Sequence, residues 1–218
     1  MTKLKAFFKN LFAKKETPKP DPVIPVPKPI TPIADHAINP GYSEAKKHDG
    51  KTEFDSKFNK YLSGFWALVG LPSYKTIIGT SFAWCGLFIF AMQTEVGMKA
   101  IGDAAAAISW SRYGQPVDWK KNGIPKSAVV RINHNGNCKS SSGNHVTYAD
   151  GDCTSEELSK PGATFPGFGG NQGNTVKRSS YSVTEICDVR WPSEMTLPGK
   201  IIKSNGCTGK ASGDETTR

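Results

Sequence analysis

The sequence predicts an α+β fold, with helices in its first part and a mainly antiparallel sheet in its second part. Apolar residues recur every three or four positions from Phe54 to Trp66, which is typical of an amphipathic helix. After Gly114 short alternating or apolar runs appear, separated by clusters of Gly, Asn, Ser and Pro, which is typical of strands. Helices followed by strands favour segregated layers over alternating βαβ units.

Three helices are expected in the first part. The first covers residues 52–70, where the apolar period is clearest. The second begins at Thr80 or Ser81, because either residue can cap a helix, and it ends near Gln93. The third covers residues 103–113 and contains four consecutive alanines, which are strong helix formers.

Five strands are expected in the second part, and no internal repeat is visible. Each run is short and is bounded by turn-forming residues, as in an antiparallel sheet. The expected strands are residues 128–132, 145–148, 165–168, 175–181 and 186–191.

Two segments precede this globular part. Residues 1–16 predict a basic amphipathic helix, with Leu and Phe on one face and Lys largely around the rest. Such a helix suits the interface of an anionic membrane, and the alternative is that it docks on a partner such as a virion protein or on the chain's own catalytic domain. Residues 17–51 contain a run of prolines that leaves no room for a helix and predicts a stiff linker. We therefore expect a globular domain at 52–203 and a loose polar tail at 204–218.

The charge balance indicates an anionic partner. Lys and Arg outnumber Asp and Glu by 28 to 19, which gives a formal net charge of +9. Such a surplus favours a membrane or a cell wall. Nucleic acid is not expected as a partner, because no zinc-finger spacing or aromatic RNA-binding motif accompanies the basic residues.

Neither a membrane span nor a secretory signal peptide is expected. The most apolar stretch, residues 77–92, is interrupted by Gly and by hydroxyl side chains, and it fits a buried helix better than a span. The apolar residues at the N-terminus are broken by lysines, and no small-residue cleavage site follows them.

Cys85 and His145 are the candidate catalytic pair. Cys85 lies in the first turn of the expected second helix, where partial positive charge favours a thiolate. His145 opens an expected strand directly after a turn, so a rigid element would hold the imidazole that takes the thiol proton. Asn171, at the end of the next strand, is the candidate third member, because an amide oxygen can fix the imidazole tautomer. Taken singly, each residue also has a structural interpretation, as core cysteine, surface histidine or turn asparagine.

Five short motifs occur in the order found in a known family: AWCGLF at 83–88, AAISWSRYG at 106–114, GNHV at 143–146, GGNQGN at 169–174 and RWP at 190–192. The chain resembles, over roughly residues 61–192, phage and bacterial proteins related to the CHAP and NlpC-type cysteine amidases and peptidases. The resemblance implies a papain-like fold, with the nucleophile at a helix N-terminus packed on the sheet, and cleavage of amide bonds in peptidoglycan.

The resemblance also implies which residues act. Cys85, His145 and Asn171 would hold the catalytic roles in an acyl transfer that needs no metal and no cofactor. Trp84 and Gln172, which lie beside them in the motifs, are candidate substrate-binding residues.

The chain departs from the family's pattern on both sides of the histidine. Asn144 replaces the usual glycine before His145, and insertions at 133–144 and 150–166 flank the histidine strand. These differences leave the nucleophile and the base in place and bear on substrate preference.

The other four cysteines are candidates for two disulfides. Cys138 and Cys153 bracket the histidine strand and form one hypothetical pair, and Cys187 and Cys207 form the other, although connectivity does not follow from sequence. A zinc site of His134, Cys138 and Cys153 is the competing interpretation, and the lack of a C-x-x-C pair speaks against it. Oxidised cysteines fit a virion, the periplasm or the cell wall.

Together these features predict a peptidoglycan hydrolase, of the phage lysin or virion-associated kind, located in a virion or in the host periplasm and cell wall. One alternative is a structural virion or wall-binding protein that keeps the fold without strong catalysis. The other is a bacterial amidase effector that is used against competitors.

Overall fold

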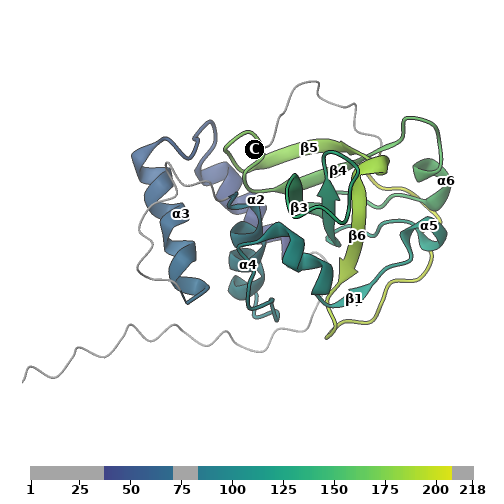
Figure 1. The fold of residues 1–218 in the computed structure, drawn as a ribbon, viewed down its shortest axis with the longest axis horizontal. Coiled ribbons are helices and arrows are strands. Elements are labelled where there is room, and N and C mark those ends of the chain that lie inside the picture. The colour runs from purple at the N-terminus through teal and green to yellow at the C-terminus, as the bar shows by residue number, and fades with distance from the viewer. Residues whose placement is uncertain (1–36, 71–82, 208–218) are drawn as a thin grey trace, which may run out of the picture.

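The computed structural model describes residues 37–70 and 83–207, and it has the predicted α+β fold. Helices α2, α3 and α4 lie on one side of a six-stranded antiparallel sheet, and the short helices α5 and α6 lie on the other side (Figure 1). The helices are α2 (Ile38–Lys47), α3 (Ser56–Leu68), α4 (Cys85–Glu95), α5 (Trp119–Asn122) and α6 (Ser155–Leu158), with 3₁₀ helices η1 (Ala107–Arg112) and η2 (Val183–Glu185). No helix in these two ranges is both long and apolar enough to cross a membrane.

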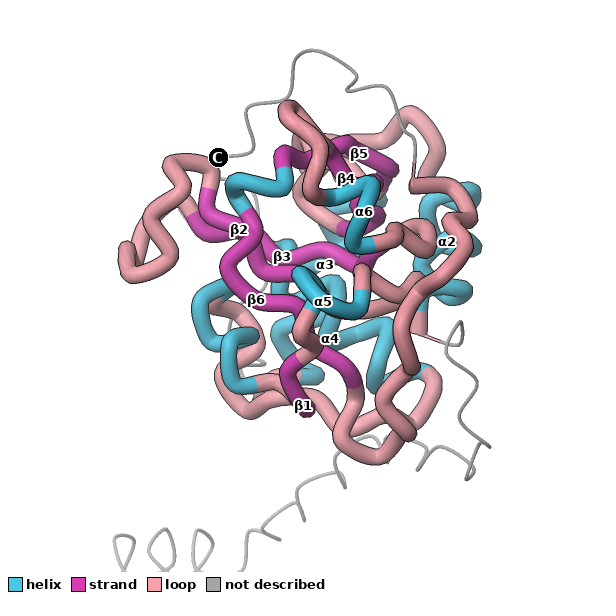
Figure 2. The backbone as a smooth tube through the Cα atoms, turned by 90° about the vertical axis from the view of Figure 1, so that its right-hand side faces the viewer, coloured by secondary structure: helices cyan, strands magenta, loops and turns pink. Residues whose placement is uncertain are grey.

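The strands pair in the order β1-β6-β2-β3-β4-β5 (Figure 2). All five expected strands are present, and β1 adds a short strand at one edge. Both central strands, β2 and β3, are buried along almost their whole length. The bounds are β1 (Gln115–Pro116), β2 (Val129–Asn133), β3 (Asn144–Ala149), β4 (Thr164–Gly169), β5 (Lys177–Ser182) and β6 (Ile186–Trp191).

The last part of the predicted linker is helical instead. Pro40 lies in the first turn of α2, where a helix needs no N–H donor, so this proline does not prevent the helix. Ile38 is fully buried, and Gly41 lies so close to the Phe168 ring that a Cβ atom would clash with it. Packing rather than propensity stabilises α2, which is why the proline pattern concealed it. The predicted helix at 1–16 lies outside the described residues.

The first expected helix is confirmed as α3, and the second as α4 with a later start. Thr80 and Ser81, the expected caps, lie outside the described residues. The helix itself begins at Cys85, and Trp84 precedes it as N-cap without a side-chain hydrogen bond. Burial of the Trp84 side chain, rather than a capping hydroxyl, therefore marks the start of α4.

The third expected helix is a shorter 3₁₀ helix, η1. Asp103 was predicted to start an α-helix there. Its carboxylate instead accepts hydrogen bonds from the Ser109 hydroxyl and the Arg112 guanidinium. The Trp110 indole N–H donates to the Ala104 carbonyl at 3.0 Å. These side-chain contacts compete with the backbone bonds of an α-helix and shorten it.

The sheet separates two apolar clusters. Val146 and Tyr148 of β3 pack with Phe88 of α4 in the first cluster. Val130 of β2 and Phe165 of β4 belong to the second cluster, on the side of α5 and α6. Because side chains alternate along a strand, covering both faces buries nearly every residue of the two central strands.

Two disulfides are present, and the predicted pairing is wrong. Cys138 joins Cys187, and Cys153 joins Cys207. The sheet order places β6 beside β2, so the loop after β2 lies against β6 rather than against the loop after β3. The second bridge fixes the start of the predicted tail as far as Cys207, whereas residues 208–218 lie outside the described part.

Candidate functional site

Cys85 is the first residue of α4, and it is the chain's only free cysteine. Its side chain is fully buried. The next residue is Gly86, where the backbone of Ala104 lies so close that only glycine fits. A Cβ atom at this position would lie 2.0 Å from the carbonyl oxygen of Ala104. Tight packing on the second residue of the helix therefore fixes the position of the candidate nucleophile.

Strand β3, which carries His145, meets the start of α4 at the neighbouring residue Val146. The backbone N–H of Val146 donates a hydrogen bond to the Cys85 sulfur, and His145 is the residue directly before it. The register of β3 with β4 covers only Tyr148 and Ala149, so this contact lies where β4 leaves β3 unpaired. The structure thus brings Cys85 to the strand that carries His145. Among the described residues no hydrogen bond joins the two side chains, and the ring of His145 packs near Tyr181, which belongs to the second cluster.

Burial controls the protonation of both groups. It raises the pKa of the Cys85 thiol to about 11, although the hydrogen bond from Val146 opposes this effect. Burial also lowers the pKa of the His145 imidazole to about 3, and the charge of His134 acts in the same direction. At neutral pH the thiol of Cys85 and the imidazole of His145 are therefore both neutral. The imidazole can accept a proton, and the thiolate has to be generated by proton transfer.

Asn171 lies just beyond the end of β4. The pairing of Tyr148 with Phe168 would place Asn171 opposite His145 if the ladder continued, but β4 ends at Gly169. Asn171 has a φ of 58°, a left-handed conformation that asparagine tolerates. Among the described residues no hydrogen bond joins it to His145, whose Nε2 has no hydrogen-bond partner there. The predicted third member is in the right segment but does not make the predicted bond.

Trp84 and Gln172, the predicted substrate-binding residues, are fully buried. The Trp84 indole N–H donates to the carboxylate of Glu53, which ties α4 to the segment before α3. The Gln172 amide donates to Thr147 Oγ1 at 3.0 Å, which ties the loop after β4 to β3. Both side chains therefore hold elements together, and neither is exposed to a substrate.

Three residues that were not assigned to the catalytic site lie around His145. The ring centroid of Tyr181 lies 5.6 Å from that of His145, and burial, followed by the charges of Cys85 and Glu185, raises the pKa of Tyr181. The rings of His134 and His145 are 6.1 Å apart, and His134 Nδ1 lies 3.5 Å from Glu185 Oε2. From the sequence, Tyr181 was recognised only as part of an expected strand, and His134 only as a candidate zinc ligand.

The competing zinc set does not fit the arrangement of its ligands. Cys138 and Cys153 are bonded to different cysteines, so neither thiolate remains for a metal. Within residues 37–70 and 83–207 no group of three His, Cys, Asp or Glu side chains is arranged to hold a metal ion.

A cysteine at a helix N-terminus, against a strand that carries a neutral histidine, has the groups that nucleophilic catalysis with acyl transfer requires. The chain matches no protein-family model, and no curated protein or solved structure is significantly similar to it. Conclusions about function therefore depend on the residues of the site and on the motifs of the sequence.

Proposed function

We propose that this protein is a cysteine hydrolase with a papain-like fold that cleaves an amide bond of peptidoglycan. The observation that carries the proposal is the hydrogen bond from the Val146 N–H to the Cys85 sulfur, because it sets a helix-borne thiol beside the histidine strand. The order of nucleophile on a helix, histidine on a strand and Asn171 on the following segment supports a papain-like arrangement.

In the proposed mechanism the neutral His145 takes the thiol proton, and the Cys85 thiolate attacks the amide carbonyl. The backbone N–H of Cys85, at the positive end of α4, helps to hold the oxyanion that forms. His145 then gives the proton to the leaving amine and later activates the water that hydrolyses the thioester. The groups that act in these steps are the side chains of Cys85 and His145 and the backbone N–H of Cys85.

Asn171 is proposed to orient His145 through its amide. The unpartnered Nε2 of His145 and the position of Asn171 at the end of β4 support this role. The proposal requires the hydrogen bond to form in the substrate complex, since it is absent from the described conformation.

Peptidoglycan is proposed as the substrate from the five ordered motifs. The net charge of +9 is compatible with an anionic wall, and the two disulfides suit a virion or the periplasm. Residues 1–16 are proposed to reach an anionic membrane or a virion protein.

The test is digestion of purified Gram-negative peptidoglycan by the wild-type protein, Cys85→Ala and the matched histidine control His48→Gln, with mass spectrometry of the released fragments. Wild type and His48→Gln should release fragments, and Cys85→Ala should release none while keeping its thermal unfolding temperature. The fragment masses separate an amidase from an endopeptidase. Equal release by wild type and Cys85→Ala would disprove cysteine catalysis.

A wall-binding protein without strong catalysis is the second candidate. The observation that favours it is the burial of Cys85 and His145, which are 0% and 2% exposed and are both neutral at pH 7. Co-sedimentation with insoluble peptidoglycan, with no fragments released by either protein, would support this candidate over the hydrolase.

A further inference from the structure

The loop between β2 and β3 brings a second histidine to the candidate site. His134 directly follows β2, and its ring is stacked on that of His145 with an angle of 29° between the planes. Tyr181 of β5 contacts both rings, with centroid distances of 5.6 Å to His145 and 6.3 Å to His134. Because Nε2 of His145 has no hydrogen-bond partner among the described residues, the orientation of this ring depends on its packed neighbours.

Glu185 of η2 completes the cluster from the other side of His134. The two side chains form an ion pair of 3.5 Å when His134 is protonated, and they are 27% and 24% exposed. Burial raises the pKa of Glu185, and the charge of His134 opposes this rise. Glu185 thus contacts His134, and His134 in turn stacks on His145.

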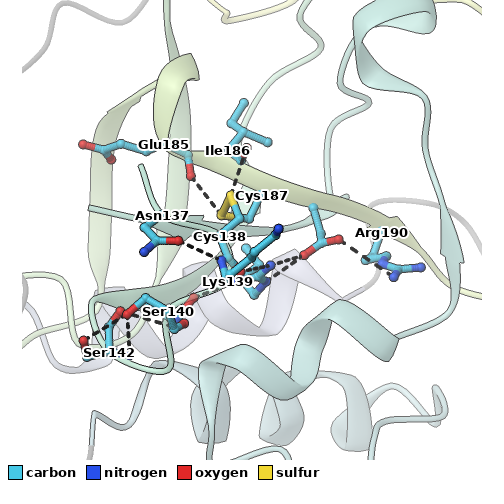
Figure 3. Close-up of polar contacts among 12 residues, drawn as sticks. Asn137, Cys138, Lys139, Ser140, Ser142, Glu185, Ile186, Cys187 and Arg190 are labelled. Carbon is cyan, nitrogen blue, oxygen red and sulfur yellow. Dashed lines mark hydrogen bonds and ion pairs between the residues drawn. A yellow bond between two sulfur atoms is a disulfide. The ribbon is translucent and has the colours of Figure 1, made fainter. Parts of the chain in front are cut away.

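The Cys138–Cys187 disulfide fixes the two partners relative to each other. Cys138 belongs to the same loop as His134, and Cys187, in β6, lies two residues after Glu185 of η2. Figure 3 shows the bridge between Cys138 and Cys187. The sulfur atoms of the bridge also lie near the carbonyl oxygens of Ile186 and Glu185. A covalent link thus joins the segment that carries the histidine to the segment that carries the carboxylate.

Buried polar side chains hold the same loop at its base. The Arg131 guanidinium donates to Asp188 Oδ2 at 2.7 Å and to Asn144 Oδ1 at 2.6 Å. The Asn133 amide donates to the Ser142 carbonyl at 2.8 Å. These bonds connect the two ends of the loop to each other and to β6. The loop that carries His134 is therefore anchored at both ends.

We propose that His134 and Glu185 are a positioning pair, which holds the imidazole of His145 in place and keeps it ready to take the proton of Cys85. The inference rests on the proposed function of Cys85 and His145. His134 lies in the insertion at 133–144, which is one of the differences between this chain and the family that it resembles. Holding His145 in place would be the role of this insertion.

The charge of His134 explains how the pair would act. The titratable groups that contact the His145 ring are His134 on the loop and Tyr181 on β5. Glu185 on η2 lies against His134, and the charges of Cys85 on α4 and of Glu185 act on Tyr181. Burial is the main reason why the pKa of His145 is low, and positive charge on His134 lowers it further because it disfavours a second positive charge nearby. Replacing His134 by neutral glutamine should therefore raise the pKa of His145.

One experiment tests the pair without any substrate. The chain contains four histidines, so NMR of the ring C–H groups can follow each of them, and His145→Gln assigns the signal of His145. His134→Gln should raise the pKa of His145 by about half a unit to one unit. His48→Gln is the matched control, because His48 Nε2 also lies 3.5 Å from a glutamate, Glu44, with a comparable exposure. An unchanged His145 titration in His134→Gln would overturn the proposal, whatever the protein hydrolyses.

A second experiment uses hydrolysis of peptidoglycan. His134→Gln and Glu185→Gln should each lower kcat about tenfold with little change in KM, since a displaced base slows the chemical step. The double variant should be no slower than either single variant, because the two residues act as one unit. Additive losses would show that they act separately and would overturn the pair. Absence of hydrolysis by the wild-type protein would refute the proposed function and leave the NMR experiment to decide on the pair.

Discussion

The sulfur of Cys85 accepts a hydrogen bond from the backbone N–H of Val146, so α4 meets β3 through its first residue. This contact lies where β4 leaves β3 unpaired. The candidate nucleophile is therefore positioned by the backbone of the strand that carries the candidate base. Any change that moves α4 relative to β3 should disturb both the thiol and the histidine.

The state of the five cysteines can be counted. Denatured protein that has not been reduced should show one thiol per chain with a colorimetric thiol reagent, and reduced protein should show five. The native protein should react slowly, because the Cys85 side chain is fully buried. Cys85→Ala should show no thiol before reduction. Five thiols without reductant would contradict both disulfides.

Acid should destabilise the protein through His145. Its folded pKa of about 3 lies below the unfolded value, so the unfolded chain binds a proton that the folded chain excludes. This contribution is fully present above the unfolded pKa and is lost as the pH falls toward the folded pKa. The free energy of unfolding should drop by about 2 kcal/mol from this group between pH 7 and pH 5.

Urea unfolding at the two pH values checks this prediction. His145→Gln removes the titrating group, so its stability should depend less on pH over the same interval. Equal pH dependence in the two proteins would show that other groups control acid unfolding.

Two glycine substitutions in helices should have opposite effects. Gly86→Ala should lower the free energy of unfolding by about 2 kcal/mol or more, because the new Cβ would meet the Ala104 carbonyl. Gly64→Ala, in the exposed part of α3, meets no atom within 4 Å and should raise it by about 0.5–1 kcal/mol. Urea unfolding of both variants tests the close approach behind Cys85, and a neutral Gly86→Ala would contradict it.

The role of Asn171 can be separated from its backbone conformation. Asn171→Gly keeps the left-handed conformation at no steric expense, whereas Asn171→Ala should lower stability by about 1 kcal/mol. If the amide orients His145, both variants should lose about tenfold in kcat on peptidoglycan. Full activity in Asn171→Gly would show that only the turn matters.

The pattern of the sequence by itself determined the class of the fold and most of its elements. The apolar period predicted α3, and short apolar runs predicted five strands, because burial of one helical face or of a strand leaves a local signature. The placement of Cys85 near a helix start and of His145 at a strand start was also local information.

Only the tertiary structure decided which distant segments meet. The position of β6 beside β2 set the partner of Cys138 and brought Glu185 to His134. The backbone pairing of Asp152 with Asn205 brought Cys207 to Cys153. The helix α2 likewise depends on contacts with Phe168, which lies far along the chain. Such pairings arise from the order of strands in the sheet and from burial between layers. Neither can be recognised from the short stretch of sequence around one residue.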